Sequence, residues 1–232
     1  MKLYFWMFLL FILLPIVSCN DTTTTEVTTQ TVAVTTVNDL LVMTFQNDIH
    51  PLSSYNGSYD TTIDSSSPDS NLSSNSVLQV GSYSGAVYRS FLRFDVSEII
   101  LDDVEVVKAY LTLGGAGTIG TAPDVGVYKV TSSWGATQTT WNNSYSSTTW
   151  TSAGGDISES PAGSKTNLAG VTFSLDTDMV RDWILDSNEN HGIVLKSLDE
   201  TTNEGYIAFV SNDDTFVERL RPKLTVYYRL VY

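Results

Sequence analysis

Basic residues are scarce in this chain, and four of them could form a binding surface on one sheet. The chain has 12 Lys and Arg against 26 Asp and Glu, and Arg89, Arg93, Lys196 and Arg221 are a third of these cations. A row of guanidinium groups can hold carboxylates through paired, charged hydrogen bonds. Arg89, Arg93 and Lys196 are therefore candidate ligand-binding residues, with Tyr110 as a candidate stacking neighbour. The alternative is that these cations pair with the chain's own acidic residues, including Asp95 and Glu98.

A second candidate site is a calcium site. Asp60, Asp69 and Asn71 supply hard oxygen ligands of the kind that Ca²⁺ prefers. The alternative is that Asp69 and Asn71 only shape the turn around Pro68. A structural calcium ion is thus one possible cofactor.

Catalytic chemistry has little support in the sequence. The chain has two histidines, His50 and His191, and no Gly-x-Ser-x-Gly elbow for a nucleophilic serine. Acidic residues are many, but no two stand out as the acid and base of a glycoside hydrolase. The chain is therefore expected not to be an enzyme.

The elements that would position these residues are mostly strands. Short hydrophobic runs alternate with turn-rich gaps, and Ser and Thr are abundant, which favours an all-β fold. The expected strands are 40–45, 77–80, 88–94, 106–113, 125–131, 172–175, 192–198, 206–210 and 224–231. One short helix is expected over 176–185, capped by Thr177 or Asp178.

Strand parity predicts which side chains enter the core. Side chains alternate between the two faces of a strand, so apolar residues two apart share a face. The pairs predicted to point inward are Leu92 and Phe94, Leu111 and Leu113, and Ile193 and Leu195. Arg89, Arg93, Lys196 and Tyr110 then point outward. The tryptophans at 134, 141, 150 and 183 are expected in the core or clamping loops.

The N-terminus has the features of an export signal. Lys2 precedes an apolar run over 3–17, which leads into Ile16-Val17-Ser18-Cys19, a sequence typical of a bacterial lipoprotein cleavage site. Cys19 is the only cysteine, and lipidation accounts for an unpaired cysteine in an exported protein. The alternative is an ordinary signal peptide cleaved after Ser18, which leaves a free thiol.

The expected organisation has three parts. They are a lipoprotein-type signal peptide over 1–18, a Thr-rich tether over 19–39 and a single β-sandwich over 40–232. The tether is low in complexity, since nine of the fifteen residues 22–36 are Thr. The protein is then held by lipid on the extracellular face of a membrane. Its net charge of -14 disfavours nucleic acid as a partner.

The chain resembles the DNRLRE, or disaggregatase-related, domain, which is also grouped as carbohydrate-binding module family 96. The most distinctive block is Arg89-Ser90-Phe91-Leu92-Arg93-Phe94-Asp95-Val96-Ser97. The other blocks follow in the family's order: 68–71, 77–81, 109–113, 127–134, 140–142, 150–156, 190–196 and 221–227.

This resemblance implies a β-sandwich of jelly-roll type and a binding role. Members are commonly attached to polysaccharide-degrading enzymes and surface proteins, and some bind acidic polysaccharide such as alginate. The leading hypothesis is a non-catalytic carbohydrate-binding domain at the cell surface. The alternative is a structural or adhesive surface protein that makes protein contacts through its sandwich edges or faces.

Overall fold

The computed structural model describes residues 35–37, 40–100, 103–167, 171–202 and 204–231. The predicted signal peptide, Cys19 and nearly all of the tether lie outside the described residues. No helix in the described ranges is long and apolar enough to cross a membrane.

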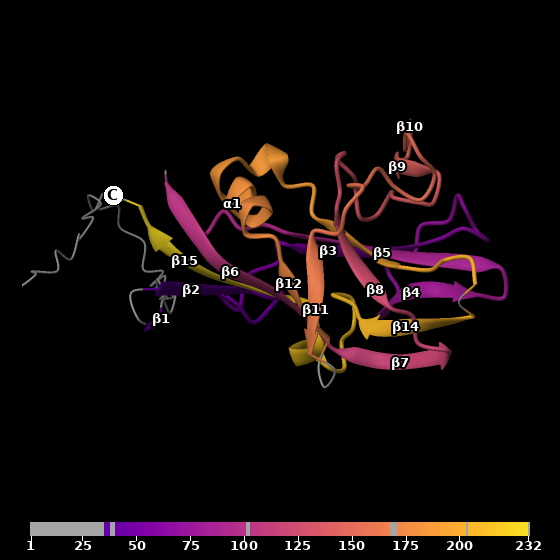
Figure 1. Cartoon of the computed structure of the whole chain (residues 1–232), viewed down its shortest axis with the longest axis horizontal. Helices are drawn as coiled ribbons and strands as arrows, with labels where there is room; N and C mark the ends of the chain where they lie inside the picture. Colours follow the sequence, from indigo (N-terminus) through magenta and orange to yellow (C-terminus); the bar gives the residue numbers. More distant parts are fainter. Residues whose placement is uncertain (1–34, 38–39, 101–102, 168–170, 203, 232) are drawn as a thin grey trace, which may run out of the picture. The chain divides into compact units, whose positions relative to one another are not determined.

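The described chain folds into antiparallel strands that form two facing sheets, with one α-helix (Figure 1). The first sheet has the order β1-β2-β15-β6-β12-β11, and the second has the order β8-β13-β5, with β3 on the other edge of β5. From β5 the ladder continues through β4 and β14 to β7. The strands are β1 (Thr35–Val37), β2 (Leu40–Phe45), β3 (Ser58–Asp64), β4 (Val77–Tyr83), β5 (Ala86–Phe94), β6 (Val104–Leu113), β7 (Gly115–Gly120), β8 (Val125–Lys129), β11 (Gly163–Asn167), β12 (Val171–Leu175), β13 (Ile193–Ser197), β14 (Gly205–Val210) and β15 (Lys223–Leu230).

The order of eight of these strands is that of a jelly roll. The chain passes between the sheets from β2 to β5, then to β6, then to β8. It returns through β11, which pairs with β12 along its length and with β8 at Gly163. From β12 the chain reaches β13 in the second sheet and β15 in the first, so the last strand lies beside the first. The sequence prediction of an all-β sandwich is confirmed.

The core lies between the two sheets, where the alternation of the sequence places it. All six residues predicted to point inward are at most 1% exposed, namely Leu92, Phe94, Leu111, Leu113, Ile193 and Leu195. Facing strands add Phe45, Phe173 and Phe209, which are fully buried. Burying one such side chain contributes about 1.5–3 kcal/mol, so this double layer of apolar residues holds the sheets together.

The helix α1 (Thr177–Leu185) forms where the sequence predicts it. Its cap is Asp176, whose side chain accepts a 2.8 Å hydrogen bond from the backbone N–H of Met179. The predicted caps, Thr177 and Asp178, are therefore wrong by one or two residues. Met179, Val180 and Trp183 are buried against the core.

The sequence did not predict β1, β3, β7 and β11, nor the short pair β9 (Asn143–Tyr145) and β10 (Thr148–Thr149). The longest of these are β3, β7 and β11. β3 reads Ser-Tyr-Asp-Thr-Thr-Ile-Asp, β7 is rich in glycine, and β11 is polar at its start. None of them shows the apolar run or clean alternation that marks a half-buried strand. Tertiary pairing with β5, β14 and β12 determines their conformation instead.

Candidate functional site

The predicted basic row lies on the outward side of the second sheet, but Arg89 is fully engaged there. Its guanidinium donates to both carboxylate oxygens of Glu200, at 2.8 and 2.7 Å, and its third nitrogen donates to the Gly154 carbonyl at 2.7 Å. It also lies over the ring of Trp141, 4.9 Å from the ring centre. Only 13% of this side chain is exposed. Arg89 therefore joins β5 to Glu200 and Gly154 and is not available to bind a ligand.

The outward side of the second sheet is covered because a long loop, residues 130–162, folds over it. Phe91, which shares this face with Arg89, is fully buried and stacks on Trp150, with a 5.4 Å separation between ring centres. Trp134 meets Phe91 from another side and donates its indole N–H to the His191 carbonyl at 2.7 Å. These rings form a second, smaller hydrophobic cluster outside the main core. Their clamping role is the one that the sequence predicts.

Lys196 and Arg93 differ in how strongly their charged groups are bound by other groups of the protein. The Lys196 ammonium lies 3.7 Å from the same Glu200 carboxylate and over the ring of Tyr128. Arg93 has one long hydrogen bond, 3.5 Å, to the Trp134 carbonyl, and it lies over the rings of Tyr59 and Trp134. The structure therefore supports the alternative that the sequence left open for Arg89 and Lys196, although the partner is Glu200 rather than Asp95 or Glu98.

Tyr110 does not lie beside this row, so the expected stacking neighbour is wrong. Tyr110 is in β6, which pairs with β12 and β15 of the first sheet, whereas Arg93 is in β5 of the second. Strand parity shows that both side chains point outward, but it does not show from which sheet. The two outward faces lie on opposite sides of the sandwich.

The outward face of the first sheet has its own set of polar and aromatic side chains. Tyr110 meets Tyr227 of β15 edge to face, with ring centres 6.0 Å apart. Hydroxyl groups surround this pair and link neighbouring strands, as Thr44 with Thr225 at 3.3 Å and Thr112 with Thr172 at 3.4 Å. The ladder register places these residues in rows across β2, β15, β6 and β12: Val42, Thr44, Lys108, Tyr110, Thr112, Thr172, Ser174, Lys223, Thr225 and Tyr227. We call this set the open face.

The outward face of the first sheet has cations, and the one carboxylate in its β6 and β15 rows, that of Glu105, is already paired with Arg229. Lys108 lies opposite Tyr227, and Lys223 lies opposite Thr112, so the two lysines are roughly 13 Å apart along the strands at about 3.3 Å per residue. Within the described residues, none of the ion pairs includes Lys108 or Lys223. Their charges are therefore available to an external group.

A cavity of about 320 Å³ adjoins the Lys223 end of the open face. Thr112 and Lys223 belong both to the open face and to the lining of this cavity. The other charged residues in the cavity lining are Arg219 and Arg221. The Arg221 guanidinium is already bound to Asp48 and to the Asp214 carbonyl, whereas Arg219 is exposed. Gly114 is required at this corner because a Cβ there would lie 2.5 Å from the Leu220 side chain. The cavity thus offers Lys223 and Arg219 to an anionic group.

The three residues of the predicted calcium site are not brought together. Asp69 accepts a 2.9 Å hydrogen bond from the Asn142 side chain, and Asn71 donates to the carbonyls of Ala136 and Thr139 at 2.8 and 2.7 Å. Asp69 and Asn71 therefore hold the 130–162 loop in place, whereas the sequence suggested only that they shape the turn around Pro68. Asp60 binds a different segment. In the described part of the chain, no three Asp, Glu, His or Cys residues are arranged to hold a metal.

Asp60 is a buried carboxyl group with incomplete hydrogen bonding. One oxygen accepts from the backbone N–H of Asn212 at 2.9 Å, while its Oδ1 and the Asn212 Oδ1 are both buried without a partner in the structure. Burial raises the pKa of Asp60 to about 7, and the hydrogen bond from Asn212 opposes this rise only in part. Asp60 is therefore predominantly protonated in mildly acidic solution.

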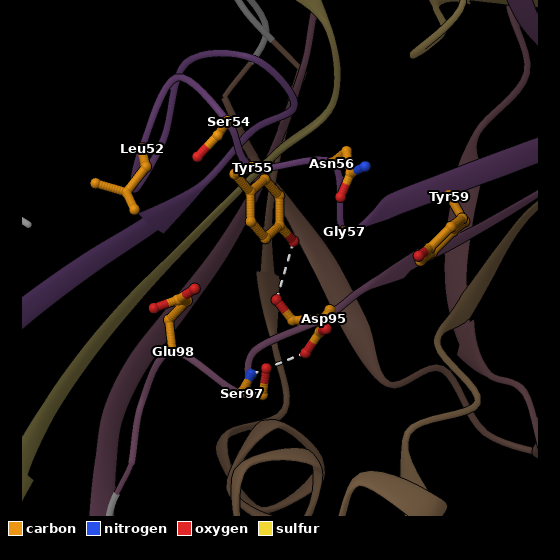
Figure 2. Close-up of a pocket in the computed structure, with 9 residues that line it drawn as sticks. All are labelled: Leu52, Ser54, Tyr55, Asn56, Gly57, Tyr59, Asp95, Ser97 and Glu98. Carbon is orange, nitrogen blue, oxygen red and sulfur yellow. Dashed lines mark hydrogen bonds between the residues drawn. The ribbon is translucent and has the colours of Figure 1, made fainter. Parts of the chain in front are cut away.

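A second, smaller cavity of about 170 Å³ lies beside Arg93 and has acidic walls (Figure 2). Figure 2 shows the Tyr55 hydroxyl pointing to the Asp95 carbonyl, which accepts its hydrogen bond at 2.9 Å, while Glu98 and Tyr59 stand at opposite sides. Burial, followed by the charge of Asp95, raises the pKa of Tyr55 far above its ordinary value, so its hydroxyl remains a donor. Two carboxylates make this cavity unsuited to a polyanion.

Sequence reasoning missed Lys108, Tyr227, Lys223 and Arg219. The alternation of β6 and β15 places the first three outward, so parity could have identified them. The sequence does not show that β6 pairs with β15. This pairing brings residues that are more than 100 positions apart in the chain onto one surface.

The fold and the open face define a β-sandwich domain of jelly-roll type whose first sheet bears aromatic, hydroxyl and lysine side chains on its outward face. The model of the family described as disaggregatase related repeat domain matches residues 60–226. The chain belongs to this family, which confirms the resemblance seen in its sequence blocks. A search of the curated proteins finds no match to the chain.

Proposed function

We propose that the chain is a non-catalytic domain that binds acidic polysaccharide at the cell surface, where the lipid on Cys19 holds it. Family membership supports a carbohydrate-binding role. The observation that carries the proposal is the open face, which bears aromatic rings, hydroxyl groups and two lysines outside the ion pairs of the described residues, in a chain of net charge -14.

Each part of the open face has a role in this proposal. The ring of Tyr110 or Tyr227 packs on the apolar face of a sugar, and the threonine hydroxyls exchange hydrogen bonds with sugar hydroxyls. Lys108 and Lys223 bind carboxylates of two sugars that are not adjacent in the same chain, and Arg219 donates to one more carboxylate at the cavity. The ligand is therefore an extended oligosaccharide rather than a single sugar.

The proposal is tested by isothermal titration of uronic acid oligosaccharides, such as those of alginate, against neutral oligosaccharides of equal length. We expect the acidic ligands to bind more tightly. Binding should weaken as salt rises, because the Debye length is about 8 Å at physiological ionic strength and shrinks further above it. Reducing ends should not increase during incubation. Equal binding of neutral ligands contradicts the charge assignment, and release of reducing ends contradicts a non-catalytic role.

Single substitutions then locate the site. Lys223→Ala and Arg219→Ala should each weaken binding by about 1.5–3 kcal/mol if the side chain makes a charged hydrogen bond to the ligand. Arg93→Ala is the matched control, since Arg93 is a cation on the opposite face. If Arg93→Ala alone lost binding, the result would show that the ligand binds to the second sheet instead.

A further inference from the structure

β7 is an edge strand without the protection that edge strands usually have. It pairs with β14 on one side, and it ends the strand order, so no described strand pairs with its other side. All six of its residues, Gly115–Gly120, are exposed and none is charged. Natural edges are usually protected by lysine, proline or a covering segment, because free backbone groups bind other strands.

Packing within the chain explains Gly120 of β7, where a Cβ would lie 2.2 Å from the Glu204 carbonyl oxygen, but it does not explain Gly115 or Gly117. A Cβ built at Gly115 or Gly117 would have no atom within 4 Å. Gly117 has φ of +153°, which favours glycine, but Gly115 has no such conformation. Glycine weakens a strand by about 0.5–1 kcal/mol relative to alanine. A strand that keeps glycine beside open space allows another backbone to approach closely.

An aromatic patch continues from β7 onto its neighbours. Ile119 is 44% exposed and lies opposite Tyr206 of β14, whose ring meets those of Tyr83 and Tyr88 at 6.2 and 5.4 Å. Tyr83 is itself 40% exposed. Figure 1 shows β7 and β14 side by side next to β4, so this patch and the free edge form one surface. We call it the β7 surface.

The charge of the chain indicates what can occupy the β7 surface. Strand and patch contain no carboxylate, whereas the chain as a whole carries a net charge of -14. A cationic partner would be attracted to the acidic parts of the molecule instead. Another strongly acidic molecule can approach closely only where carboxylates are absent, and a second copy of this chain is such a molecule with a matching free edge.

We propose that the β7 surface is a self-association site at which β7 of one copy pairs antiparallel with β7 of a second copy. This goes beyond the proposed glycan binding and does not depend on it. Pairing about a two-fold axis through Thr118 places Thr118 opposite Thr118 of the other copy and Gly117 opposite Ile119. The ladders of the two copies then join into one sheet, and all six residues of each β7 are small or uncharged at the contact.

The test is sedimentation velocity of the full chain in nonionic detergent over a wide range of protein concentration. We expect a reversible monomer–dimer equilibrium. Thr118→Lys places two like charges directly opposite each other at the axis and should weaken the dimer about tenfold or more, because facing like charges repel. Thermal unfolding of each variant shows whether it is folded.

Phe216→Lys is the matched control, since Phe216 is 92% exposed and lies outside β7. It should leave the dimer unchanged. A wild-type chain that stays monomeric at every concentration overturns the proposal. So does a dimer that persists in folded Thr118→Lys but is lost in Phe216→Lys. Ile119→Lys provides a second variant of the same surface if Thr118→Lys does not fold.

Discussion

The two outward faces of the sandwich use cations in opposite ways. On the second sheet, Arg89 and Lys196 share Glu200, and Arg89 also holds the 130–162 loop to the sheet through Gly154 and Trp141. On the first sheet, Lys108 and Lys223 take part in none of the ion pairs between described residues, Lys108 is exposed and Lys223 lines the cavity. One set of charges stabilises the fold, and the other is free to meet a ligand.

This difference shows what strand parity can and cannot establish. Parity correctly placed Leu92 and Leu111 inward and Arg93 and Tyr110 outward, because alternation is local to each strand. Whether an outward side chain reaches solvent depends on a distant segment. A row of cations in an acidic chain is therefore evidence for a binding site only when its face is open.

The buried carboxyl of Asp60 should give the largest effect, because its charge is the most deeply enclosed. Its pKa is raised to about 7 in the folded chain, against 3.8 ordinarily, so the folded state keeps a proton that the unfolded state releases. This group's contribution to stability therefore falls as pH rises from about 4 to about 7, by on the order of 4 kcal/mol at most.

Asp60→Asn checks this expectation, because asparagine cannot ionise and can donate to the unpartnered Asn212 oxygen. The variant should be more stable than the wild type at pH 8 by urea denaturation, and the gain should shrink toward pH 4. Glu159→Gln, at an exposed position, is the control for removing one negative charge. A gain that is independent of pH contradicts the assignment.

Arg89→Met should give the next largest effect and separates the two faces directly. It leaves Glu200 half-paired beside Lys196 and frees the Gly154 carbonyl, so we expect a loss of about 3 kcal/mol in unfolding free energy. Lys108→Met, the same change on the open face, should alter stability by no more than about 0.5 kcal/mol. Similar losses in both variants would show that the faces do not differ in this way.

The double variant Arg89→Met with Glu200→Leu sharpens the comparison. Replacing both partners removes the unpaired charge, so part of the lost stability should return. The measurement is the midpoint and slope of urea unfolding for the single and double variants. No recovery would mean that Arg89 stabilises the loop chiefly through Gly154 and Trp141.

Arg93→Ala should have the smallest effect on ligand binding. Arg93 has a single long hydrogen bond and lies beside the acidic cavity of Asp95 and Glu98, which repels a polyanion. Titration with the same uronic acid oligosaccharide should give an affinity close to that of the wild type, while Tyr110→Ala on the open face should bind measurably less tightly.

The sequence predicted the fold well and the site only in part. Apolar alternation located the core strands, and the apolar residues Met179, Val180 and Trp183 located the helix. β3 and β7 were missed because neither contains an apolar run or a clean alternation of apolar and polar residues. Tyr110 was assigned to the wrong surroundings because the pairing of β6 with β15 joins residues far apart in the chain. Asp69 and Asn71 hold the 130–162 loop, and no local sequence pattern predicts where that loop lies.

The most direct test of the central claim is to acetylate the lysines with a limiting amount of reagent, with and without a uronic acid oligosaccharide, and to measure each site by mass spectrometry. Lys108 and Lys223 should react rapidly in the free chain and be protected by the oligosaccharide. Lys196, held by Glu200 and Tyr128, should react slowly in both samples. Protection of Lys196 with unchanged reaction at Lys108 and Lys223 would contradict the account and place the ligand on the second sheet.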